Sequence, residues 1–135
     1  MSLLSNFDIA GSAMSAQSLR LNITASNMAN ADTISGDSAS AYRARNPVFS
    51  SMMLDQRREA VGVELLGVVE SNMSIPVRHA PGHPLADADG NIYSSNVDLI
   101  EEMVNMISAS RSYQSNIEVL NTSKQLLMRT LSLGE

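Results

Sequence analysis

The chain has 135 residues, 44% of them hydrophobic and 17% charged, which is typical of one folded domain with a modest core. A net charge of −5 and a single lysine argue against a nucleic-acid partner, and the lack of cysteine excludes disulfides and thiolate sites. No stretch reaches the roughly 18 apolar residues of a membrane-spanning helix. The N-terminal residues also lack the basic and apolar segments of a cleaved signal peptide. We therefore expect neither membrane insertion nor classical secretion.

The first predicted element is a helix from about residue 5 to residue 30. Ser5 and Asp8 resemble a capping start, and Asn30 is suited to the left-handed conformation that ends many helices. A heptad pattern marks one face of this helix. It consists of Phe7, Met14, Leu21 and Met28, and of Ala10, Gln17, Thr24 and Ala31 three residues after each.

Three asparagines, Asn22, Asn27 and Asn30, lie near the end of this helix, although asparagine is a poor helix former. Only two of the residues from 3 to 31 are charged, and small neutral polar residues fill the remaining polar positions. Amides and hydroxyls cost less to bury than charges and can hydrogen-bond across a contact. We therefore expect the amides to face other protein chains, with a helix stop signal as the alternative for Asn30.

The middle of the chain changes to a strand period. Alternation over residues 61–70 predicts a strand with one wet face, and residues 41–49 are its expected partner, with Pro47 restricting that strand to an edge or a bulge. Residues 34–40 indicate a polar loop. Residues 79–93 are rich in turn formers, and Asp89-Gly90 within them is a strong tight-turn signal. A small β element that contains a hairpin is the prediction.

The titratable residues of this middle segment do not form a recognisable site. His79 and His83 are four residues apart, but proline and glycine between them exclude a helix, and only Asp87 and Asp89 lie near as further ligands. The run DADGN lacks the glycine spacing and the closing glutamate of a calcium loop. No phosphate-binding glycine-rich loop and no activated nucleophile is present in the sequence. We predict no metal site, no cofactor and no enzymatic activity.

The last predicted element is a helix of some 34 residues, about 50 Å long at 1.5 Å per residue. Asp98 and Glu101 form a capping box at its start. Its apolar stripe repeats every seven residues and consists of Leu99, Met106, Tyr113, Leu120 and Leu127, with Met103, Ile117 and Leu131 in a second row. A further stripe of Ile100, Val104 and Ile107 widens the apolar face, so more than one neighbouring helix is expected.

Together the two helices have more apolar and neutral polar surface than the middle segment is able to cover. We therefore expect other subunits to cover them, in a polymer of axial helices in which flexible methionines adapt to slightly different contacts. The residues predicted to pack between subunits are Phe7, Met14, Leu21, Asn27, Met28, Asn30, Leu99, Met103, Met106, Tyr113, Ile117, Leu120, Leu127 and Leu131.

Three stretches of the chain resemble the bacterial flagellar rod and hook axial protein family. The N-terminal stretch contains FDIAGSAM and AQSLRLNITASNMANADT, and the middle stretch is PGHPLADADG. The C-terminal stretch is NVDLIEEMVNMISASRSYQSNIEVLNTSKQLLMRTLSLGE. The resemblance, with the short length, implies a structural subunit of the proximal rod, the drive shaft that transmits torque across the periplasm and lines the export channel. It implies a mainly α fold with a small β element. Residues 1–33 and 96–135 would pair as an antiparallel coiled coil, and residues 34–95 would form the hairpin-containing middle.

The resemblance also implies partners and an export route. The expected partners are other copies of the chain, the B-type, F-type and distal rod proteins, the adaptor to the membrane ring, and the type III flagellar export apparatus, which exports such proteins without a cleaved signal peptide. Two alternatives stay open. One is a helical-hairpin adaptor or secretion chaperone that binds a partner helix as a stable dimer. The other is a surface-active amphipathic protein, which the scarcity of Lys and Arg on the polar faces disfavours.

Overall fold

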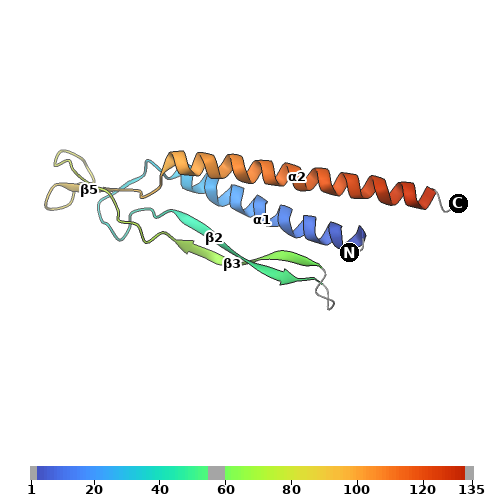
Figure 1. Cartoon of the computed structure of the whole chain (residues 1–135). Coiled ribbons are helices and arrows are strands. Elements are labelled where there is room, and N and C mark those ends of the chain that lie inside the picture. The colour runs from blue at the N-terminus through green and yellow to red at the C-terminus, as the bar shows by residue number, and fades with distance from the viewer. Residues whose placement is uncertain (1–2, 55–59, 133–135) are drawn as a thin grey trace.

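The computed structural model describes residues 3–54 and 60–132 and confirms a mainly α fold with small β elements. Figure 1 shows helix α1 lying between a second, longer helix and a long β-hairpin, with a small sheet at one end. In chain order the elements are α1 (Leu3–Ala29), β1 (Ile34–Ser35), β2 (Arg45–Met53), β3 (Val61–Glu70), β4 (Val77–His79), β5 (Asn91–Ser94) and α2 (Leu99–Ser132).

The two helices run antiparallel and pack side by side (Figure 1). Helix α2 has the predicted 34 residues, and the carboxylate of Asp98 caps it by accepting hydrogen bonds from the backbone N–H groups of Ile100 and Glu101 at 2.9 and 3.2 Å. Helix α1 already begins at Leu3, so Ser5 lies inside the helix and the predicted capping start is wrong. A serine in a helix interior costs less than about 0.7 kcal/mol relative to alanine, which a continuing helix tolerates.

Small and polar residues form the contact line between the helices. Glu102, Ala109 and Ser123 are the buried residues of α2, and they fall on one heptad line with half-buried Asn116. The predicted stripe of larger residues flanks this line: Met106, Tyr113, Ile117, Leu120 and Leu127 are half-buried, whereas Leu99, Met103 and Leu131 are exposed. Small residues at the line let the helices approach closely, because the spacing of two helices depends on the side chains between them. The centre of the contact is therefore shifted from the predicted stripe.

The β2–β3 hairpin covers the side of α1 opposite α2 (Figure 1). The strand predicted at residues 61–70 is confirmed as β3, but its partner β2 begins four residues later than predicted. A bulge interrupts the register between Val48 and Phe49, close to Pro47, and leaves Leu66 without a partner. The prediction of a single wet face is wrong: Leu65 and Val69 are 42% and 51% exposed. One helix covers only part of a two-stranded ribbon, and the bulge changes which side chains face it.

Ser12 fixes the hairpin to α1. Its hydroxyl accepts a hydrogen bond from the backbone N–H of Val63 at 3.2 Å and donates to the carbonyl oxygen of Ile9 at 2.8 Å. The neighbouring Gly62 is buried, and a Cβ there would lie 2.8 Å from the Ser12 hydroxyl oxygen. Glycine at position 62 therefore permits the close approach of β3 to the helix.

A three-stranded antiparallel sheet in the order β1-β5-β4 lies at the end of the helix pair. The sequence did not predict it, since its strands have only two to four residues and lie within or beside segments rich in turn formers. The side chain of Ile92 on β5 is fully buried. Gly90 has a φ of +75°, which confirms the tight turn predicted at Asp89-Gly90.

Candidate subunit interface and its polar centre

Asn27 lies where α1, β2 and α2 meet, and it is 1% exposed. Its Nδ2 donates hydrogen bonds to the backbone oxygen of Arg45 at 2.9 Å and to Glu102 Oε1 at 3.0 Å. Its Oδ1 accepts hydrogen bonds from the backbone N–H of Arg45 at 2.9 Å and from the Tyr42 hydroxyl at 3.0 Å. Because an asparagine amide has two N–H donors and two acceptor lone pairs, all of its capacity is used within the chain.

The three asparagines near the end of α1 therefore have three different environments. The expectation that the amide of Asn27 is satisfied by another chain is wrong, because this chain satisfies it completely. The amide of Asn30 donates to the backbone oxygen of Ser26 at 2.8 Å, which favours its alternative role as a residue that ends the helix. Asn22 is exposed and remains available to another chain.

An outer apolar patch lies on α2, on the side away from α1. It consists of Ile100, Val104 and Ile107, which are 74%, 61% and 55% exposed. Residues three and four apart lie on the same face of a helix, so these three side chains form one surface. The next residue on this face is Arg111, which is also exposed. The stripe predicted to widen the apolar face therefore points outward from the helix pair.

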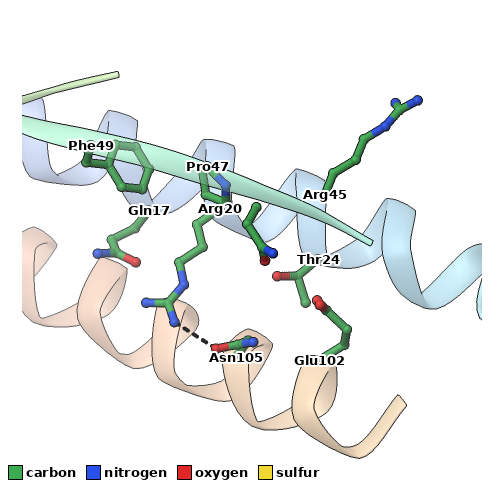
Figure 2. Close-up of a pocket in the computed structure, with 9 residues that line it drawn as sticks. Gln17, Arg20, Thr24, Arg45, Pro47, Phe49, Glu102 and Asn105 are labelled. Carbon is green, nitrogen blue, oxygen red and sulfur yellow. Dashed lines mark hydrogen bonds between the residues drawn. The ribbon is translucent and has the colours of Figure 1, made fainter. Parts of the chain in front are cut away.

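A polar pocket of about 260 Å³ lies between α1, β2 and α2 (Figure 2). In Figure 2 the side chains of Gln17 and Arg20 extend from α1 towards α2, and Glu102 and Asn105 extend back from α2. Arg20 Nη2 donates a hydrogen bond to Asn105 Oδ1 at 2.8 Å, and Glu102 is 6% exposed. Gln17 Oε1 is shielded from solvent and has no hydrogen-bond partner among the residues that the structure describes. Thr24, Arg45, Asn46, Pro47 and Phe49 complete the lining.

The sequence did not identify this pocket. In the sequence, Gln17 is one position of the heptad pattern, and Arg20 is one of the two charged residues from 3 to 31. The residues that face them from β2 and α2 are distant in the sequence. The signal that was present is the replacement of apolar residues by a glutamine and a threonine at two successive heptad positions, 17 and 24.

The turn-rich segment before β5 is organised around Asp87. Its Oδ1 accepts hydrogen bonds from the backbone N–H groups of Asp89 and Asn91 at 2.9 and 2.8 Å, and its Oδ2 accepts one from the Tyr93 hydroxyl at 3.0 Å. The hydrogen bond from Asn91 is the main reason that the pKa of Asp87 is lowered from 3.8, and the bond to Asp87 raises the pKa of Tyr93 above 10.0. Within residues 3–54 and 60–132, no group of three or more His, Cys, Asp or Glu residues is placed to hold a metal ion.

The predicted packing residues occupy three kinds of position in the single chain. Asn27 is internal, the three exposed members belong to α2, and the rest are half-buried. Their role between subunits stays a prediction.

Both ends of the chain match families of flagellar proteins. Residues 7–34 match the family described as flagella basal body rod protein, and residues 88–133 match the family described as flagellar basal body rod FlgEFG protein C-terminal. These matches cover most of α1 and all of α2. They define the class as structural proteins of the flagellar basal-body rod, which are not enzymes.

Relatives that match over the full length specify the family further. The chain is 52% identical to the flagellar basal-body rod protein FlgC of Yersinia enterocolitica and 50% identical to that of Salmonella typhimurium. It is 44% identical to FlgC of Buchnera aphidicola subsp. Acyrthosiphon pisum. Each comparison covers 100% of both proteins. The chain belongs to the FlgC family of flagellar basal-body rod proteins.

Proposed function

We propose that the chain is a structural subunit of the proximal rod, assembling with copies of itself and with other rod proteins to transmit torque across the periplasm and to line the export channel. Membership of the FlgC family supports the rod assignment. The position within the rod and the individual partners follow from the family resemblance of the sequence.

The observation that carries the proposal is the surface of the isolated chain. A compact monomer of 14.5 kDa has an accessible surface of about 6,900 Å² by the usual scaling with mass, whereas this chain exposes 9064 Å². The excess is of the order of 2,000 Å², more than the roughly 800 Å² that each partner buries in a standard protein interface. Large apolar side chains contribute to it, among them Ile100, Leu66 and Leu131 at 65–74% exposed. Such a surface is expected of a subunit that other chains cover.

The helix pair supplies the axial part of this subunit. Helices α1 and α2 are antiparallel, and the buried residues of α2 recur at positions 102, 109 and 123 of one heptad line. A seven-residue repeat along a helix contact favours a left-handed coiled coil, so we propose this packing for residues 1–33 and 96–135, with residues 34–95 as the middle segment. The outer apolar patch then faces neighbouring subunits.

Export and localisation follow from the same assignment. We propose that the type III flagellar apparatus exports the chain without a cleaved signal peptide, and that the chain contacts the B-type, F-type and distal rod proteins and the adaptor to the membrane ring. In the described residues, neither helix combines the length and apolarity that a membrane crossing needs.

The outer apolar patch gives a test of subunit packing. Val104→Glu places a charge at a position that is 61% exposed in the single chain, so we expect the free energy of unfolding to change by no more than about 0.5 kcal/mol. If neighbouring subunits cover the patch, the same charge is buried in the rod, and basal-body assembly and motility are lost.

The matched control is Thr122→Glu, which adds the same charge to an exposed position further along the same face of α2. We expect a smaller loss there, since the residue replaced is polar. Thermal melting of the purified chains, counts of basal bodies per cell and complementation of motility are the measurements. Normal motility with Val104→Glu would contradict packing through this patch. A stable dimer that fails to join basal bodies would instead favour the adaptor or chaperone alternative.

A further inference from the structure

We propose that the polar pocket between α1, β2 and α2 binds the carboxamide side chain of an asparagine or glutamine from a neighbouring rod subunit. This inference rests on the proposed function, because only an assembling chain has such a neighbour. The three layers of the fold meet at this pocket, so a side chain bound there would contact all of them (Figure 2).

The first observation is the unfilled acceptor of Gln17. Its Oε1 is shielded from solvent and accepts no hydrogen bond from the described part of the chain, an unfavourable state for a polar atom. The Gln17 side chain lines the pocket, so a rotation about its torsions would bring the amide to face the cavity. An N–H donor entering the pocket would supply the missing hydrogen bond.

The second observation is that the pocket lining contains both a cationic side chain, Arg20, and an anionic one, Glu102. An arginine has five N–H donors, and among the described residues the guanidinium of Arg20 donates one hydrogen bond, to Asn105. The Glu102 carboxylate is almost fully buried, and within residues 3–54 and 60–132 its one side-chain hydrogen bond is with Asn27. The guanidinium of Arg45 points away from the pocket in Figure 2, and its Nε lies 3.8 Å from Glu70 Oε1.

The charges of Arg20 and Glu102 determine which kind of side chain the pocket can bind. A charged side chain would be attracted to Arg20 or Glu102 and repelled by the other, whereas a neutral group that both donates and accepts hydrogen bonds satisfies both. A carboxamide has this combination: its oxygen accepts from Arg20, and its nitrogen donates to Glu102 or to Gln17. The volume of about 260 Å³ is below the 300–1,000 Å³ of pockets for small-molecule ligands and suits one side chain. Exposed carboxamides such as Asn22, Asn72 and Gln114 are available on other copies of the chain.

The test is Gln17→Met, which removes the amide and preserves the length of the side chain. We expect the purified chain to melt at the wild-type temperature or higher, because an unpaired acceptor is removed, while the number of basal bodies per cell falls at least tenfold. Gln17→Glu keeps an acceptor at the same place, so we expect assembly to be largely retained. Ser18→Met, which adds a methionine at an exposed position of α1 and removes no carboxamide, is the control and should assemble normally.

Each outcome decides the proposal. Normal assembly of Gln17→Met would overturn it and leave the pocket filled by water alone. Loss of assembly in both Gln17→Met and Gln17→Glu would overturn the carboxamide assignment in favour of a carboxylate bound to Arg20. If the wild-type chain itself fails to restore basal bodies to a strain of the source bacterium that lacks it, the proposed function fails and the pocket is not at issue.

A second measurement does not depend on the stability of Gln17 variants. The chain has no cysteine, so Asn46→Cys at the exposed rim of the pocket introduces a single thiol. We expect a maleimide to label this thiol at least tenfold more slowly in isolated basal bodies than in the free chain. Equal labelling rates would overturn the proposal.

Discussion

Replacement of Asn27 by leucine tests the polar centre of the fold, which consists of Asn27 and its hydrogen-bond partners Tyr42, Arg45 and Glu102. The substitution removes four hydrogen bonds and places an apolar side chain against the Glu102 carboxylate, which is 6% exposed. The backbone N–H and carbonyl oxygen of Arg45 lose their partner at the residue where β2 begins. Tyr42 is only half-buried, so a water molecule can take the place of Asn27 as the hydrogen-bond partner of its hydroxyl.

Each buried polar group left without a partner costs about 1 to 3 kcal/mol. Three such groups cost about 3 to 9 kcal/mol, and burying the leucine side chain offsets about 2 kcal/mol. We therefore expect Asn27→Leu to lower the free energy of unfolding by about 1 to 7 kcal/mol, with a central value of about 4 kcal/mol. That is a large part of the roughly 5–15 kcal/mol that stabilises a domain. It corresponds to a fall in melting temperature of roughly 10 to 20 °C.

Thermal and urea melts of the purified chain measure this loss directly, before any assembly. Asn22→Leu is the control, because that asparagine is exposed on the same helix and its replacement should change the free energy of unfolding by no more than about 0.5 kcal/mol. If Asn27→Leu has the same melting temperature as Asn22→Leu, the hydrogen bonds of Asn27 do not hold the three layers together, and the reasoning is refuted.

Three further substitutions test other parts of the chain. Gly62→Ala should destabilise the chain by about 1 to 3 kcal/mol in urea melts, because its Cβ would lie 2.8 Å from the Ser12 hydroxyl that holds the hairpin; wild-type stability would refute that close approach. Leu120→Asp should abolish assembly and motility while export continues, because the charge is forced into the helix contact; normal swimming would contradict this. The lowered pKa of Asp87 stabilises the fold above pH 3.8, and this contribution is lost as the pH falls through the lowered pKa. Asp87→Asn should remove this loss of stability at acid pH from melts recorded as a function of pH. It should also return the raised pKa of Tyr93 towards 10.0 in a tyrosinate absorbance titration. An unchanged tyrosine titration would contradict the hydrogen bond between Asp87 and Tyr93.

The long helices could be predicted from the sequence because their signals are local. The side chain of Asp98 caps α2 where the capping pattern placed it, and the heptad pattern gave the correct length. The same pattern misplaced the centre of the helix contact, since it ranks positions by apolar size. The closest approach requires small residues such as Ala109 and Ser123.

The polar centre could not be predicted, because its members are brought together by tertiary structure. Asn27 and Glu102 are 75 residues apart in the sequence, and Asn27 looks like any helix-surface amide until β2 crosses it. The scarcity of charge on α1 predicts that other subunits cover this helix. In the structure the chain's own hairpin and α2 cover α1 on two sides, whereas the far side of α2 stays uncovered.

The presence of the chain in purified basal bodies tests the central claim most directly. Deletion of the chain in the source bacterium, complementation with a tagged copy, and imaging of the isolated basal bodies would locate it. We expect loss of motility on deletion, recovery with the copy, and density for the antiparallel helix pair within the rod. Motile cells without the chain, or basal bodies whose rods lack it, would contradict the account.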